Sequence, residues 1–134
     1  MKNNVVLDTN ILIYYLDKSS IHNKYSKDIV KNSGFNFCLT TKNISEFCAV
    51  LSKIKDFEYS DIEKELNNLL NSFMILYPNE YSLNIFNSLI HKYKPSGNRV
   101  YDIEIVSIML AYNINKIATV NTSDFKDIDE VEII

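Results

Sequence analysis

Short apolar runs rich in β-branched residues alternate along the chain with segments in which apolar residues recur at helical spacing. The first run, Val5 to Leu7, ends at Asp8, and helical periodicity begins at once over residues 11–16. Strands are also predicted at 35–39, 74–77, 116–120 and 131–134, and helices at about 20–31, 41–55, 60–72, 79–93 and 102–112. This alternation predicts an α/β fold with a mostly parallel central sheet and helices on both of its faces.

Length and composition suit a single globular domain. The chain has 134 residues, of which 46% are hydrophobic and 23% charged, and we expect one domain over residues 1–134. Pro95 and Gly97 mark residues 94–98 as the clearest loop. Cys38 and Cys48 form no C-x-x-C pattern, which favours two reduced thiols. With no signal-like segment and no apolar run long enough for a bilayer, we expect a soluble, cytoplasmic protein.

The net charge of -3 restricts how this chain could meet a nucleic acid. Nucleic-acid binders are usually basic, because they neutralise phosphates. A chain this acidic must use a local basic patch or hold its own acids around bound cations. Lys42, Arg99 and Lys126 are the candidates for phosphate contacts, with solvated surface charge as the alternative for each.

Four acidic residues lie where predicted strands end or where the following helices begin. Asp8 follows the first strand, Glu46 lies early in the next long helix, Asp102 starts a helix after the loop, and Asp124 lies past the fourth strand. Ligands of parallel sheets bind beyond the carboxyl ends of the strands, where strand order reverses. Two carboxylates about 4 Å apart repel by about 4 kcal/mol at an effective dielectric near 20 unless a cation separates them. Oxygen ligands of this kind select Mg²⁺ or Mn²⁺, which can activate water and hold a phosphodiester.

Each of the four acids also has an ordinary structural alternative. Asp8 and Asp102 suit helix N-caps. Glu46 suits a solvated charge at the margin of an apolar helix stripe, and Asp124 suits a polar turn. The ordered set, with each member facing the expected crevice, favours a shared metal site over four separate roles.

Four segments resemble the motifs of PIN-domain ribonucleases, in the family's order and at its usual spacing. Residues 5–13 are similar to its apolar strand followed by Asp-x-Asn, and 40–47 to its second motif with the acid Glu46. Residues 102–111 resemble its Asp-led, small-residue helix, and 118–125 resemble Thr-x-Asn-x-x-Asp-Phe. The likeness covers nearly the whole chain, and at this length it is greatest to VapC-type toxins of type II toxin–antitoxin systems.

The resemblance implies a three-layer αβα sandwich and an endoribonuclease that hydrolyses RNA phosphodiester bonds with Mg²⁺ or Mn²⁺. It also implies a homodimer and a cognate antitoxin whose tail blocks the cleft. The implied metal ligands and catalytic residues are Asp8, Glu46, Asp102 and Asp124. Asn10 and Asn121 would orient ligands or water, with help from Thr9. Val120 stands where related sequences often carry a basic residue, which removes one cation from the expected cleft.

Two alternatives come from other classes of protein. A haloacid-dehalogenase-like phosphatase also begins with a strand and an Asp, but Asn10 replaces the second acid that such a mechanism needs. A catalytically silent PIN-like module would serve as a binding partner, although a silent site has no reason to keep four uncompensated carboxylates. A small DNA-binding protein encoded immediately upstream would favour the toxin.

Overall fold

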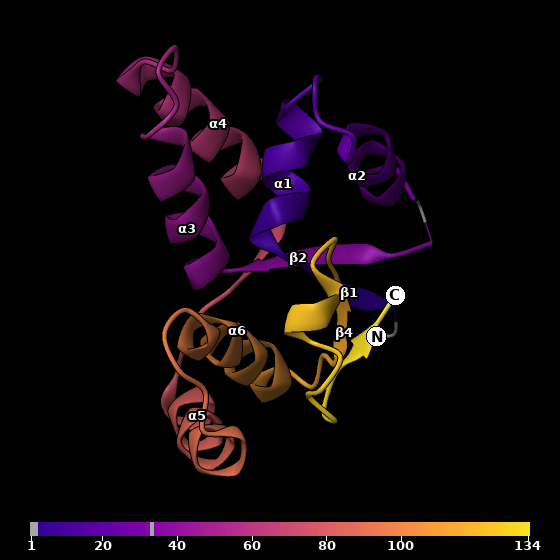
Figure 1. Ribbon diagram of the computed structural model, residues 1–134, viewed down its shortest axis with the longest axis vertical. Coiled ribbons are helices and arrows are strands. Elements are labelled where there is room, and N and C mark those ends of the chain that lie inside the picture. Colours follow the sequence, from indigo (N-terminus) through magenta and orange to yellow (C-terminus); the bar gives the residue numbers. More distant parts are fainter. Residues whose placement is uncertain (1–2, 33) are drawn as a thin grey trace.

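The computed structural model describes residues 3–32 and 34–134, and it has the α/β architecture that the sequence predicts (Figure 1). Its strands are β1 (Asn4–Leu7), β2 (Asn36–Thr40), β3 (Met74–Leu76), β4 (Lys116–Ala118) and β5 (Glu132–Ile133). Its helices are α1 (Thr9–Leu16), α2 (Asn23–Val30), α3 (Thr41–Leu51), α4 (Tyr59–Ser72), α5 (Glu80–Tyr93) and α6 (Arg99–Ala111). A 3₁₀ turn at Thr122–Asp124 follows β4.

The strands form one sheet in the order β3-β2-β1-β4-β5, and every pairing described within it is parallel. The chain runs outward from β1 through β2 to β3, and it then returns to place β4 on the other side of β1. Val5 therefore pairs with Phe37 on one side and with Lys116 on the other. Connections that leave neighbouring strands in opposite directions open a crevice beyond their carboxyl ends. That crevice lies after Leu7 and Ala118.

Side chains along the strands point alternately into two separate cores, which is why helices cover both faces of the sheet. Val5 and Leu7 belong to one core, whereas Val6 belongs to the other, and all three are fully buried. Figure 1 shows α1 to α4 on one side of the sheet and α5 and α6 on the other. The predicted three-layer αβα sandwich is confirmed.

Two helices are shorter than predicted because local hydrogen bonds turn the chain. α2 begins at Asn23 rather than near residue 20, and the Asn23 side-chain amide donates to the carbonyl oxygens of Tyr14 and Tyr15 at the end of α1. α3 ends at Leu51 rather than near residue 55, since the amides of residues 53 and 54 donate to carbonyls three positions back. Periodicity extends through such turns, so it overestimates helix length.

Two predicted helix starts are wrong by a few residues. The pattern at 60–63 predicted a capping box, but α4 begins at Tyr59, and the Glu58 amide instead donates to the Asp61 carboxylate at 3.0 Å. α6 begins at Arg99, so Asp102 lies in its first turn and does not cap it. Sequence alone cannot choose between overlapping capping patterns, because the choice depends on where the preceding chain enters the helix.

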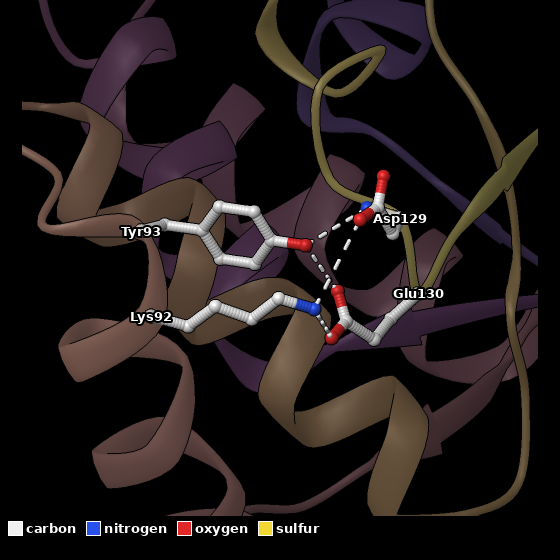
Figure 2. A network of polar contacts seen from close by, with 4 residues as sticks. All are labelled: Lys92, Tyr93, Asp129 and Glu130. Carbon is white, nitrogen blue, oxygen red and sulfur yellow. Dashed lines mark hydrogen bonds and ion pairs between the residues drawn. The ribbon is translucent and has the colours of Figure 1, made fainter.

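A polar cluster ties the end of α5 to the segment before β5 (Figure 2). The Tyr93 hydroxyl accepts from the Asp129 amide at 2.9 Å and donates to Glu130 Oε1 at 2.5 Å. Lys92 Nζ lies 2.7 Å from Glu130 Oε2 and 4.0 Å from an Asp129 carboxylate oxygen. The two-residue edge strand β5 is thereby fastened by side chains as well as by its pairing with β4.

Cys38 is buried and Cys48 half-buried, and both are free thiols, as predicted. No helix within residues 3–32 and 34–134 has the length and apolar character needed to cross a membrane.

Candidate metal centre

A pocket of about 350 Å³ opens at the carboxyl edge of the sheet. All four predicted acids and the three predicted supporting residues contribute to its wall. Its lining consists of Asp8, Thr9, Asn10, Ile13, Tyr14, Glu46, Val50, Asp102, Asn121 and Asp124. The fold therefore brings together side chains that come from the start of α1, the middle of α3, the start of α6 and the turn after β4.

Asp8 caps a helix and also lines the pocket. It is the N-cap of α1, where its Oδ1 accepts from the Thr9 amide at 2.9 Å. Its Oδ2 accepts from the Thr119 hydroxyl at 2.8 Å, and the residue still contributes to the pocket wall. Only 8% of Asp8 is exposed. Capping and a place in the pocket wall are therefore compatible for this one carboxylate.

Thr119, which the sequence analysis did not single out, supports Asp8 from the end of β4. It follows the strand, which ends at Ala118 rather than at residue 120 as predicted, and it is 1% exposed. Its Oγ1 accepts from the Asn121 amide at 3.0 Å and from Asn10 Nδ2 at 3.4 Å. With its acceptor sites used, the hydroxyl donates to Asp8. Its place in the Thr-x-Asn segment was the available signal.

Glu46 is held through a second hydroxyl. Thr9 Oγ1 donates to Glu46 Oε1 at 3.0 Å, and Asn43 Nδ2 donates to Thr9 Oγ1 at 3.2 Å. Asn43 is fully buried and also contacts Thr40, the N-cap of α3. The sequence predicted a supporting role for Thr9, and it assigned none to Asn43 or Thr40. A buried asparagine three residues before the site acid was the signal that could have been used.

Asp102 and Asp124 reach the pocket from two other elements. Asp102 lies in the first turn of α6, and Asp124 closes the 3₁₀ turn after β4. Arg99 Nη2 donates to the backbone carbonyl of Asp124 at 3.2 Å, which joins the two segments. Within the described part of the chain, no side chain or amide donates to the Asp102 carboxylate. Asp102 therefore faces the pocket with less hydrogen-bonded support than Asp8.

The electrostatics of the pocket fit a bound cation. Burial, opposed by hydrogen bonds from Thr119 and Thr9, raises the pKa of Asp8 from 3.8 to about 6, and the charges of Glu46 and Asp124 add to the rise. Burial also raises the pKa of Asp102 from 3.8 to about 7, with further contributions from the neighbouring carboxylates and an opposing one from Arg99. Groups that resist ionisation in each other's presence are stabilised as carboxylates by a divalent ion.

The carboxylates border the pocket without forming a closed coordination shell. Among residues 3–32 and 34–134, no three acidic, histidine or cysteine side chains converge closely enough to surround one ion. Asp8 and Glu46 have their orientation set by hydroxyl donors, whereas Asp102 has no such donor in the described structure. Ion binding would therefore draw the less constrained carboxylates toward the fixed ones. The donor set, all oxygen and strongly acidic, suits Mg²⁺ or Mn²⁺.

The residues predicted to contact phosphate are not part of the pocket lining. Lys42 Nζ stands 3.8 Å from the centroid of the Tyr101 ring, one helical turn from Glu46. Arg99 lies in the same helical turn as Asp102 and is exposed. Lys126 is exposed two residues after Asp124. None of these three cations is among the residues that line the pocket, whose charged side chains are the four carboxylates.

The family model for the PIN domain matches residues 5–131, and the chain belongs to the PIN-domain family. The structure is similar to VapBC2 from Rickettsia felis bound to a promoter DNA fragment, with TM-score 0.76, 19% identity, and coverage of 98% of this chain and 97% of that one. It is also similar to VapBC-1 from nontypeable Haemophilus influenzae, with TM-score 0.76, 20% identity, and coverage of 98% and 96%.

A third similar structure is the Mycobacterium tuberculosis toxin VapC20, described as cleaving the sarcin-ricin loop. The TM-score is 0.71 at 10% identity, with 96% of this chain and 98% of that chain covered. No curated protein matches the chain in sequence. At these identities the structural likeness establishes the fold over the full length, and it leaves activity and partners to be argued from the pocket.

Proposed function

We propose that this protein is a divalent-metal-dependent endoribonuclease that hydrolyses RNA phosphodiester bonds and acts as the toxin of a toxin–antitoxin pair. The observation that carries the proposal is the meeting of four carboxylates, from Asp8, Glu46, Asp102 and Asp124, around one pocket of a PIN fold. The raised pKa of Asp8 and of Asp102 supports it, since both report an excess of negative charge and burial that a cation relieves.

The four acids would hold Mg²⁺ or Mn²⁺. When bound, such an ion activates water and stabilises the charge that develops on a phosphodiester. Asp8 stays oriented through Thr119, and Glu46 through Thr9. Asn121 lines the pocket beside Asp124 and would orient a ligand or a water. Asn10 is positioned by two long hydrogen bonds, since its Oδ1 accepts from the Val120 amide at 3.4 Å and its Nδ2 donates to Thr119 Oγ1 at 3.4 Å.

RNA would be held at the pocket mouth by few cations. Lys42 and Arg99 are our candidates for phosphate contacts, since each lies within one helical turn of a proposed metal ligand. The chain carries a net charge of -3, so attraction of RNA depends on these local contacts and on bound metal. A purified sample should cleave RNA with Mg²⁺ or Mn²⁺, and chelation by EDTA should stop the reaction.

The toxin assignment draws on the solved structures that this fold resembles. Two of them are described as VapBC assemblies and one as a toxin. We propose a homodimer and a dedicated antitoxin that inserts a basic side chain among the carboxylates, where it replaces the cation. Apolar surface for the same antitoxin is available on α1, where Tyr15 and Leu16 line a groove of about 320 Å³ with α4.

Expression in a bacterial host tests the toxin assignment. The parent chain should arrest growth, and co-expression of the upstream open reading frame should restore it. Asp102→Ala should abolish the arrest while the protein stays soluble and still binds its partner. A harmless parent chain that co-purifies with no small protein would overturn the toxin assignment and leave the nuclease to be tested in vitro.

One observation favours an alternative, a catalytically silent PIN-like binding module. No three candidate ligands within the described residues surround an ion position in this structure. A silent module would bind RNA or a protein without metal-dependent cleavage, and Asp8→Asn would leave that binding unchanged. A haloacid-dehalogenase-like phosphatase is disfavoured, because Asn10 is an amide held by the Val120 backbone rather than a general acid.

A further inference from the structure

We infer that Asn43 is a positioning residue of the metal site, which acts through the Thr9 hydroxyl to fix the orientation of Glu46. This inference rests on the proposed function, because it concerns how one proposed ligand is held. Asn43 does not line the pocket and is fully buried behind it. Its side chain lies between Thr40 at the end of β2 and Thr9 at the start of α1.

The backbone of Thr40 determines which way the Asn43 amide faces. The Thr40 amide, a group that can only donate, lies 2.9 Å from Asn43 Oδ1, and the Thr40 hydroxyl donates to the same oxygen at 2.7 Å. That hydroxyl in turn accepts from the backbone amide of Asn43 at 3.1 Å. Asn43 therefore presents its carbonyl oxygen to Thr40, and its Nδ2 group must face Thr9.

The direction of the next hydrogen bond follows from this arrangement. Nδ2 of Asn43 donates to Thr9 Oγ1 at 3.2 Å, so Thr9 is an acceptor toward Asn43. The single hydroxyl hydrogen of Thr9 is then free to donate to Glu46 Oε1 at 3.0 Å. The backbone amide of Thr40 can only donate, and it therefore fixes the direction of the whole series. Each hydrogen bond is donated toward Glu46, from Thr40 to Asn43, from Asn43 to Thr9 and from Thr9 to Glu46.

Thr119 holds Asp8 in the same way that Thr9 holds Glu46, so the arrangement occurs at two carboxylates of the site. The Asn121 amide donates to Thr119 Oγ1 at 3.0 Å, and Thr119 then donates to Asp8 at 2.8 Å. Two threonines thus donate to carboxylates of the site, and each also accepts a hydrogen bond: Thr119 from a backbone amide and Thr9 from the Asn43 side chain. Asn43 is the added member on the Glu46 side, since the Thr40 amide donates to Asn43 Oδ1 and Asn43 Nδ2 donates to Thr9.

A purely structural role for Asn43, as the partner of Thr40 in a capping box, predicts something different. α5 contains the matched case, in which the Asn79 amide donates to Ser82 Oγ at 2.7 Å. Ser82 stands at the third position of its helix, as Asn43 does in α3. The Ser82 hydroxyl donates back to the Asn79 carbonyl at 2.8 Å and has no contact with the acid pocket. Ser82→Ala is therefore a control for the loss of a capping partner alone.

The first arm of the test measures metal binding by thermal shift, with Mn²⁺ as the probe. Asn43→Ala should raise the Mn²⁺ concentration that gives half of the maximal shift about 10- to 100-fold, the usual cost of losing a group that orients a ligand. Thr9→Val should do the same, and Thr9→Ser should recover most of that loss. Ser82→Ala should lower the starting melting temperature and leave the Mn²⁺ concentration unchanged.

The double variant Asn43→Ala/Thr9→Val tests whether the two residues act in series. If Asn43 acts through Thr9, the double variant should need no more Mn²⁺ than the weaker single variant. Fully additive losses of Mn²⁺ affinity would overturn the relay, that is, the series of hydrogen bonds by which Asn43 acts on Glu46 through Thr9. So would an Asn43→Ala variant that loses melting temperature as Ser82→Ala does and binds Mn²⁺ at the parent concentration.

The second arm needs no metal and separates this inference from the proposed function. In ¹⁵N NMR spectra of the EDTA-treated protein, the Asn43 side-chain amide signals should be slow to exchange with water and should shift with Thr9→Val. They should stay in place with Ser82→Ala. A parent protein that ignores Mn²⁺ but passes this arm would refute the metal-dependent function and leave the relay standing. Asn43 amide signals unaffected by Thr9→Val would overturn the relay itself.

Discussion

The Thr119 hydroxyl donates to Asp8 Oδ2 across 2.8 Å, and this bond joins residues 111 positions apart in the sequence. The bond lies at the end of the sheet where β1 and β4 end side by side. Leu7 pairs with Ala118, so the residues that follow each strand come level with one another. The pairing of the two strands thereby determines that the first acid of the chain meets a hydroxyl from near its end.

We expect Thr119→Val, although it keeps the shape of the side chain, to lower the stability of the protein and to weaken metal binding. The change removes the donor to Asp8 and leaves the Asn121 amide without its acceptor, a loss of about 1–3 kcal/mol in the free energy of unfolding. The pKa of Asp8 should rise further, since the Thr119 hydrogen bond opposes the effect of burial. Denaturant unfolding and a Mn²⁺ titration would measure both effects. Thr119→Ser, which keeps the hydroxyl, should restore them, and a Thr119→Val protein indistinguishable from the parent would contradict this account.

The stability of the metal-free protein should fall as the pH rises from about 4 to about 7 and should level off above that range. Asp8 and Asp102 have raised pKa values in the folded state, so over this range the folded protein keeps protons that the unfolded chain has released. The stabilisation is present at lower pH and lost as the carboxyls ionise. For Asp8, which is 8% exposed, the loss is on the order of 3 kcal/mol.

Melting temperatures of EDTA-treated protein measured from about pH 4 to about pH 8 would show this dependence. Added Mg²⁺ or Mn²⁺ should reverse it, because the ion binds the ionised carboxyls and its stabilising effect grows with pH. Asp8→Asn should flatten the metal-free profile and abolish RNA cleavage. It keeps one hydrogen bond of the carboxylate but meets a second donor at either Thr119 or Thr9, so its stability gain should be small. A parent profile that rises with pH without metal would contradict the assigned electrostatics.

Lys42→Met should weaken RNA binding without affecting the metal site. The substitution keeps an aliphatic side chain against Tyr101 and removes the charge that lies 3.8 Å from that ring. If Lys42 contacts a phosphate, the slope of log affinity against log salt should become shallower by about 0.7 for single-stranded RNA. Lys24→Met, on α2 and away from the pocket, is the matched control. Equal slopes for parent and Lys42→Met would remove Lys42 from the RNA contacts.

Tyr93→Phe should loosen the last strand and leave the pocket intact. The hydroxyl links the Asp129 amide to Glu130, and its loss should cost about 1 kcal/mol or somewhat more because Glu130 is charged (Figure 2). Hydrogen exchange should accelerate at the β5 amides before it does so elsewhere in the sheet. Lys92→Met should have a smaller effect, since Lys92 is half exposed and its ion pair is screened by solvent. Unchanged exchange at β5 in Tyr93→Phe would show that strand pairing alone holds this segment.

The local sequence pattern was sufficient to predict the layers of the fold and the positions of the four acids at the ends of strands and the starts of helices. Val5 to Leu7 is an apolar run buried on both faces, as strands between two helical layers must be, and Asp8 follows it directly. Period and position are properties of neighbouring residues, so they can be inferred without knowing the fold. The same reasoning failed at helix ends: α6 was expected to begin at about residue 102, but it begins at Arg99, so Asp102 lies in its first turn.

Only the tertiary structure decided which groups support those acids. Thr119 and Asn43 are ordinary residues in sequence, and their roles come from partners 111 and 34 positions away. Hydrogen-bond direction depends on which backbone amide lies beside each side chain, and that depends on strand pairing and helix entry. The pKa of Asp102 likewise rises through burial and through the charges of Asp124, Asp8 and Glu46, which only folding brings near. Periodicity depends on adjacent residues, whereas orientation and charge coupling depend on distances that the folded chain alone defines.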